Sequence, residues 1–151
     1  MTPEQFIKQL QRQQKKIVEA MRRAVPLKAA VIAEQHFKDN FRKGGFQDNG
    51  LTAWKPSKRI GKAKGAAGSY GTLLSGRNHL YSSIRHRTEP FKGIVWTDVP
   101  YAAAHNEGTN NAGRNHNVRL PKRQFMGDSA ELRKKIAALV EKEINRILNN
   151  H

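Results

Sequence analysis

The chain has 151 residues, with 28 Lys and Arg against 12 Asp and Glu, a formal net charge of +16, and no cysteine. This length fits one domain with a moderate core, and the missing cysteines exclude disulfides, thiolate catalysis and Cys-based zinc sites. The charge favours polyanions or acidic protein surfaces as partners. No stretch approaches the roughly 18 apolar residues that a membrane helix needs, and no apolar signal core is present. We therefore expect neither a secreted nor a membrane-spanning protein.

Residues 1–43 carry two helical patterns. Thr2 is placed as an N-cap, with Gln5 at the position that completes a capping box. An apolar stripe at helical spacing follows, made of Phe6, Ile7, Leu10, Ile17, Val18 and Met21. A second pattern runs on to Gly44, and Pro26 either starts this helix or kinks one longer helix.

Residues 44–78 are predicted to form a basic, glycine-rich, flexible loop, because they hold eight of the 12 glycines of the chain. The stretch 61–71 offers little apolar area to offset the cost of ordering its backbone, about 1 to 2 kcal/mol per residue. We expect that stretch to be mobile unless a partner orders it. The candidate contacts to nucleic acid or to an acidic partner are Lys55, Lys58, Arg59, Lys62 and Lys64.

Residues 79–127 are predicted to form antiparallel strands and a loop. The segments 82–88 and 91–98 read as two strands joined by a Glu89-Pro90 turn, 106–117 as a loop and 118–125 as a further strand. If the last segment is a strand, Arg123 shares a face with an aromatic residue at 125. That arrangement indicates a pinned or paired guanidinium, with an acidic group across a subunit boundary as one candidate partner.

Residues 128–151 are predicted to form an amphipathic helix with Asp128 as N-cap and Glu131 at the capping-box position. Its apolar stripe consists of Leu132, Ile136, Leu139, Val140, Ile144, Ile147 and Leu148. We expect this stripe to be buried against the sheet or against the first helix.

The sequence predicts no catalytic residue, no metal site and no cofactor, and hence no enzyme. His105 and His116 are of a residue type found in metal-dependent nuclease sites. However, such sites need a fixed ligand set that usually includes carboxylates, and Glu107 is the only acid near these histidines. The glycine-rich stretch 61–71 lacks the Gly-Lys-Ser/Thr ending of a phosphate-binding loop.

Four short motifs follow one another along the chain. They are Trp54-x-Pro56, Leu74-Ser75-Gly76, Tyr101-Ala102-x-x-His105-x-x-Gly108 and Pro121-x-Arg123-x-Phe125-x-Gly127. In this order before the last helix, they resemble the phage virion morphogenesis family, the Mu-like tail completion proteins. The chain departs from the family pattern after Gly76, where three residues rather than one precede Leu80.

The resemblance implies an α+β fold, with a small antiparallel sheet packed by the N- and C-terminal helices. It also implies a structural, non-enzymatic role in tail completion or head-tail joining, through a homo-oligomer with the form of a ring. The implied partners are other phage tail or connector proteins. Assembly would take place in the cytoplasm of the bacterial host, and the protein would then be part of the virion. The gene would belong to an active phage or to a prophage.

Two alternatives stay open on the sequence alone. Trp54 is either a buried anchor for its loop or a contact between subunits. The positive charge, with no acidic residue from 49 to 88, also suits a basic nucleic-acid-binding module.

Overall fold

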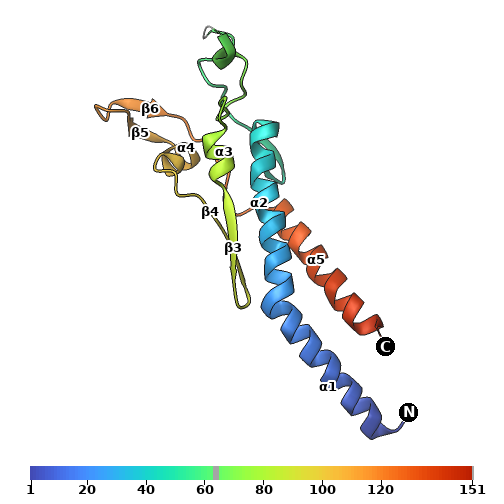
Figure 1. The fold of residues 1–151 in the computed structure, drawn as a ribbon. Coiled ribbons are helices and arrows are strands. Elements are labelled where there is room, and N and C mark those ends of the chain that lie inside the picture. The colour runs from blue at the N-terminus through green and yellow to red at the C-terminus, as the bar shows by residue number, and fades with distance from the viewer. Residues whose placement is uncertain (63–64, 151) are drawn as a thin grey trace.

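The structure is a computed structural model that describes residues 1–62 and 65–150. Its elements in chain order are α1 (Pro3–Glu19), the π turn η1 (Ala20–Ala24), α2 (Val25–Lys43), β1 (Gly45–Asp48), β2 (Gly50–Ala53), the 3-10 turn η2 (Gly65–Gly68), α3 (His79–Ser83), β3 (Arg85–Glu89), β4 (Lys92–Trp96), α4 (Ala102–Glu107), β5 (Thr109–Ala112), β6 (Val118–Leu120) and α5 (Ala130–Asn149). Figure 1 shows α1, η1 and α2 as one long rod, with α5 beside it and α1 extending beyond the rest of the molecule. The predicted α+β class is confirmed.

The N-terminal capping box forms as predicted. Thr2 N–H donates to Gln5 Oε1 at 2.8 Å, and Gln5 N–H donates to Thr2 Oγ1 at 3.2 Å. These bonds satisfy backbone donors that a helix start otherwise leaves unpaired.

Pro26 lies in the first turn of α2, which directly follows the π turn, and the rod continues through it (Figure 1). Proline has no N–H, so the carbonyl of Arg22 loses the helical donor four residues further on. That carbonyl instead accepts the N–H of Phe91, at 3.0 Å, from the tip of the β3-β4 hairpin. The proline therefore creates the backbone acceptor on which the hairpin tip docks.

The strands form three separate antiparallel pairs, β1-β2, β3-β4 and β5-β6, where the sequence predicted one small sheet. The predicted turn at Glu89-Pro90 is confirmed, because residue 89 pairs with Lys92 across it. The last predicted strand, 118–125, is shorter, since β6 ends before Pro121, which has no N–H to continue the ladder. The predicted loop 106–117 contains the partner strand β5.

The hairpin β1-β2 occupies part of the segment 44–78, for which the sequence predicts a loop throughout. Gly44 ends α2 in the left-handed region, at φ 67°, and the chain turns directly into β1. A Cβ on Gly45 would lie 2.5 Å from the carbonyl oxygen of Thr52, so the strands approach closely because this position carries no side chain.

The apolar core gathers around Phe41 of α2. Its ring centroid lies 5.6 Å from that of Trp54, 5.8 Å from that of Tyr81 and 5.2 Å from that of Phe125. The buried members of this core are Phe41, Trp54, Leu80, Ile84, Val99, Ala102 and Phe125. The core thus joins α2 to the middle of the chain.

A buried polar cluster lies beside that core. Oδ1 of Asn40 accepts from the backbone and side-chain amides of Gln47, at 3.1 and 3.0 Å, and Nδ2 of Asn40 donates to the carbonyl of Phe125 at 2.9 Å. Nε2 of His36 lies 3.3 Å from the carbonyl of Gln47 and 3.2 Å from Oγ of Ser129. Because these groups satisfy one another, they fix how α2, β1 and the start of α5 meet.

The N-cap of α5 is Ser129, and the prediction of Asp128 was wrong. Oγ of Ser129 accepts the N–H of Leu132 at 3.1 Å and donates to the carbonyl of Gln47 at 2.6 Å. Asp128 is exposed and forms an ion pair with Arg133. The physical reason is the second bond of Ser129, because it ties the cap to a distant strand and places Asp128 outside.

Candidate assembly site

Three of the four motifs meet at one place, which we call the motif junction and define by residues 54–56, 101–108 and 121–127. Nε1 of Trp54 donates to the carbonyl of Gln124 at 2.8 Å. Trp54 is buried, with 7% of its surface exposed, so its indole is used within its own chain.

Arg123 joins its own segment to both of the others. Its Nε donates to the carbonyl of Lys55 at 2.8 Å, one terminal nitrogen lies 3.3 Å from the carbonyl of Pro56, and its own backbone N–H donates to the carbonyl of His105 at 2.8 Å. Burial lowers the pKa of the guanidinium, which stays protonated at neutral pH. The pinned guanidinium therefore has backbone carbonyls as partners rather than a carboxylate.

The turn 101–108 fits against the last segment through its backbone. Oδ1 of Asn106 accepts the N–H groups of Phe125 and Met126, at 2.9 and 3.0 Å. Gly108 has φ +75°, and a Cβ there would lie 2.8 Å from the backbone nitrogen of Lys122. Only glycine allows this approach without strain. Ala102 is buried in the apolar core.

The remaining motif residues lie around the edge of the junction. Tyr101 is 43% exposed, and its hydroxyl lies 3.1 Å from Nδ1 of His79. Pro121 is half-buried after β6, and Gly127 is exposed before α5. Gly76 is exposed in the segment that precedes α3. Its motif neighbours Leu74 and Ser75 line a recess together with Tyr101, His105 and Arg123.

A small recess of about 240 Å³ opens at the junction. Nδ1 of His105 is buried and has no hydrogen-bond partner within residues 1–62 and 65–150. Burial, and then the charge of Arg123, lower the pKa of His105, so its ring is neutral at pH 7. The polar residues that line the recess are Ser57, Arg59, Ser75, Tyr101, His105 and Arg123.

The recess lacks the parts of a hydrolytic site. The described residues that line it include no carboxylate to orient the imidazole or to act as an acid. Across the part of the chain that the structure describes, no group of three or more His, Asp or Glu is placed to hold a metal ion. The arrangement can position the backbone of three segments and accommodate water near His105.

The basic residues predicted to contact nucleic acid or an acidic partner lie in different surroundings. Lys55 and Lys58 line a second recess of about 270 Å³ together with Arg119. Arg59 donates to the carbonyls of Tyr70 at 3.1 Å, Gly71 at 2.8 Å and Leu74, so its guanidinium holds the loop closed. Lys62 is exposed, and Lys64 lies outside the described residues.

Sequence reasoning missed Asn106 as a residue of the junction. The available signal was its type, because Asn in a short turn frequently bonds to nearby backbone groups. It also missed that Arg59 organises its own loop, for which a single basic residue among many gives no local signal.

The junction lies within an α+β fold that carries a long helix at each end. The chain belongs to the phage virion morphogenesis family, whose model matches residues 4–145. A search of curated proteins and a search of solved structures each gave no match. The match spans most of both terminal helices as well as the four motifs, and it confirms the resemblance. Among the helices of the described residues, none is both long and apolar enough to cross a membrane.

Proposed function

We propose that this member of the family is a non-enzymatic structural protein that acts in tail completion or head-tail joining through oligomeric assembly. The observation that carries the proposal is the use made of the motif side chains. Trp54, Arg123 and Asn106 bond to the protein's own backbone, and the recess beside them has no carboxylate among its described lining. In a family of virion morphogenesis proteins, such a chain acts by contact.

The partners in this proposal are further copies of the chain and other tail or connector proteins. Such a joint has the form of a ring, and a ring needs two different faces on each subunit that meet head to tail. The protein would assemble in the bacterial host cytoplasm and remain in the virion.

Light scattering tests the proposal. The purified chain is sized alone and after mixing with the tail and connector proteins encoded beside it. We expect a mass that is a multiple of the chain mass, or a stable complex with one of those proteins. A strict monomer that binds none of them contradicts the proposal.

A second candidate function, nucleic-acid binding, is favoured by the cationic recess at Lys55, Lys58 and Arg119, whose described lining includes no carboxylate. Counterion release makes such binding steeply dependent on salt, whereas a specific binder keeps a preference between sequences at about 150 mM salt.

The matched variants are Lys55→Gln with Lys58→Gln, and Lys134→Gln with Lys142→Gln on exposed positions of α5. Arg59 is left unchanged because it closes its own loop. If the first pair weakens retention on duplex DNA at least tenfold more than the second pair and also abolishes tail assembly, nucleic-acid binding is part of the function. If assembly survives, the affinity for DNA is incidental.

A further inference from the structure

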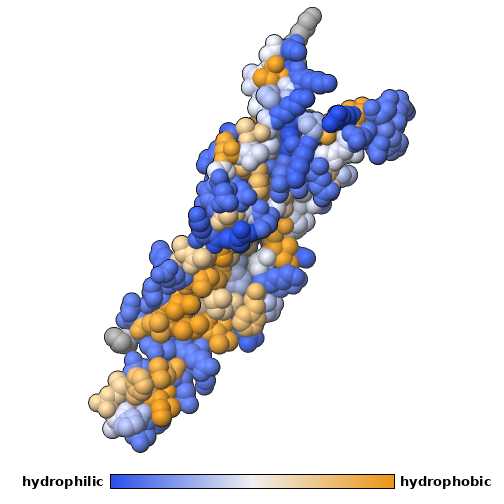
Figure 2. Space-filling view, turned by 180° about the vertical axis from the view of Figure 1, so that it is seen from behind, coloured by the Kyte–Doolittle hydropathy of each residue, from blue (hydrophilic) through white to orange (hydrophobic). Residues whose placement is uncertain are grey.

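The apolar stripe of α1 is not covered by the rest of the chain. Phe6 is 52% exposed, Ile7 53% and Leu10 48%, and α1 contains no buried residue. Figure 2 shows hydrophobic side chains gathered at the end of the molecule where α1 lies. An amphipathic helix normally packs such a stripe against a core, and a helix of this length is only marginally stable alone in water.

The same stripe is buried where the rod continues into α2. Ile17 and Met21 are followed on the apolar side by Pro26, Ala30 and Phe37, of which the last three are buried. The step from 21 to 26 is five residues, which matches the π turn between the two helices. The stripe therefore runs along one side of the rod and loses its cover only in α1.

The polar surface of α1 is basic. The helix α1 carries four cationic side chains and two carboxylates. The cations are Lys8, Arg12, Lys15 and Lys16, and the carboxylates are Glu4 and Glu19.

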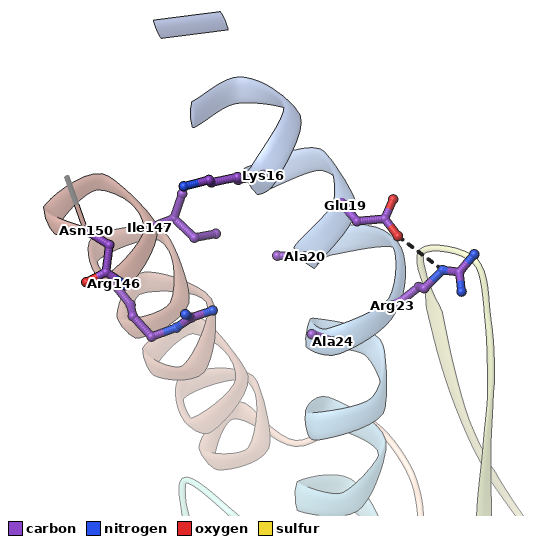
Figure 3. Close-up of a pocket in the computed structure, with 8 residues that line it drawn as sticks. All are labelled: Lys16, Glu19, Ala20, Arg23, Ala24, Arg146, Ile147 and Asn150. Carbon is purple, nitrogen blue, oxygen red and sulfur yellow. Dashed lines mark ion pairs between the residues drawn. The ribbon is translucent and has the colours of Figure 1, made fainter. Parts of the chain in front are cut away.

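A groove of about 500 Å³ lies between the rod and the end of α5, with an apolar part formed by Ala20, Ala24 and Ile147. In Figure 3, Lys16 and Arg146 reach into this space from the two helices. Glu19 is the one carboxylate among the described residues of its lining, and it is paired with Arg23 at 3.1 Å.

We propose that the stripe of α1 forms a docking surface for an amphipathic helix of a different virion protein, with acidic residues flanking its apolar face. Charge complementarity decides the occupant, because a helix on this stripe meets the cations of α1 on its flank. A second copy would bring another chain of net charge +16 against this surface. The proposal rests on the structural function proposed above and names one contact within it.

Two labelled synthetic helical peptides serve as probes of the full-length protein. They share one leucine stripe, and one is flanked by Glu and the other by Lys. Fluorescence anisotropy at about 150 mM salt should show at least tenfold tighter binding of the Glu-flanked peptide. Equal binding of the two peptides, or no binding of either, overturns the proposal.

Three double variants test whether the Glu-flanked peptide binds to the stripe of α1. Ile7→Gln with Leu10→Gln should weaken binding of the Glu-flanked peptide at least tenfold. The control is Leu27→Gln with Val31→Gln, an apolar pair on α2 that is equally exposed, at 49% and 48%, and it should leave binding unchanged. Circular dichroism checks that each variant is folded. Lys8→Gln with Lys15→Gln should reduce the preference for the Glu-flanked peptide, because the stripe stays and the flanking charge is reduced.

The same variants distinguish the proposed occupant from a second copy of the chain and from a membrane surface. Light scattering of Ile7→Gln with Leu10→Gln should give the oligomeric state of the unchanged chain, and a loss of self-association in this variant would identify a second copy as the occupant. Binding to anionic lipid vesicles that depends on Ile7 and Leu10, without binding of the Glu-flanked peptide, would identify a membrane surface. Either result overturns the proposal about α1 and leaves the proposed function to its own test.

Discussion

Arg123 is the residue on which the motif junction depends most directly. Arg123 is 7% exposed, and its guanidinium donates to two consecutive carbonyls of the loop that follows Trp54. Hydrogen bonds from a charged donor contribute about 1.5 to 3 kcal/mol each, and the planar fork of arginine matches two acceptors where lysine offers a point charge.

Arg123→Lys should therefore lower the free energy of unfolding by about 1 to 3 kcal/mol, measured by urea denaturation. Arg119→Lys, on an exposed residue of β6, is the matched control and should change it by less than about 0.5 kcal/mol. Equal effects of the two substitutions would mean that the guanidinium does not hold the junction.

His36 and His105 make stability depend on pH. Burial is the main cause that lowers the pKa of each below 6.5, with a further contribution from Lys135 at His36 and from Arg123 at His105. Nδ1 of His36 lies 3.0 Å from Nζ of Lys135, so it accepts a hydrogen bond and resists a proton.

Both histidines are neutral in the folded and unfolded chain above about pH 7. As pH falls through 6.5, the unfolded chain takes up protons before the folded chain does, so the free energy of unfolding should fall by up to about 1.4 kcal/mol per pH unit for each group. Urea titrations at pH 7.5, 6.5 and 5.5 measure this slope. His105→Gln should reduce the slope and His116→Asn, on an exposed loop position, should keep it. A slope that is the same in all three proteins refutes the assignment.

At the scale of elements, the start of α5 gives a direct test of the packing. Ser129→Ala removes both the cap to Leu132 and the bond to Gln47, and it should cost about 1 to 2 kcal/mol of stability. Asp128→Ala removes an exposed ion pair and should cost less than about 1 kcal/mol. Thermal denaturation of the two variants ranks them, and a larger loss from Asp128→Ala would reverse the assignment of the cap.

The same element shows why sequence reasoning found the helix but misplaced its cap. Asp128 and Ser129 are both good N-cap residues, and local preference does not separate them. The bond that decides between them reaches Gln47 in β1, 82 positions away. The three long helical segments were predictable because their apolar stripes repeat over many turns.

The hairpins show the same limit. The turn at Glu89-Pro90 has a local signature, and β3-β4 was predicted from it. The β1-β2 hairpin has no such signature, since Gly44 and Gly45 read as loop residues. One of them ends a helix, and the other allows a close approach of two strands. Asn40 and His36 were likewise missed, because polar residues on a helix are expected at the surface, and their partners lie in distant segments.

At the scale of the whole molecule, the motifs and the exposed surfaces have separate tasks. The motif junction holds the middle of the chain together by hydrogen bonds to its own backbone. In the proposed functions, the surfaces offered to partners are the uncovered stripe of α1 and the recess at Lys55 and Lys58. The four motifs indicated the family correctly, and four of their side chains, Trp54, Ala102, Arg123 and Phe125, are buried within the chain.

The central claim is that the protein completes a virion by contact with other structural proteins. Electron microscopy of lysates from a phage lacking this gene tests it most directly, with the intact gene supplied on a plasmid as the control. We predict normal heads and tails that stay unjoined or unfinished, and complete particles when the gene is supplied. Complete, infectious particles in the absence of the gene would contradict the account.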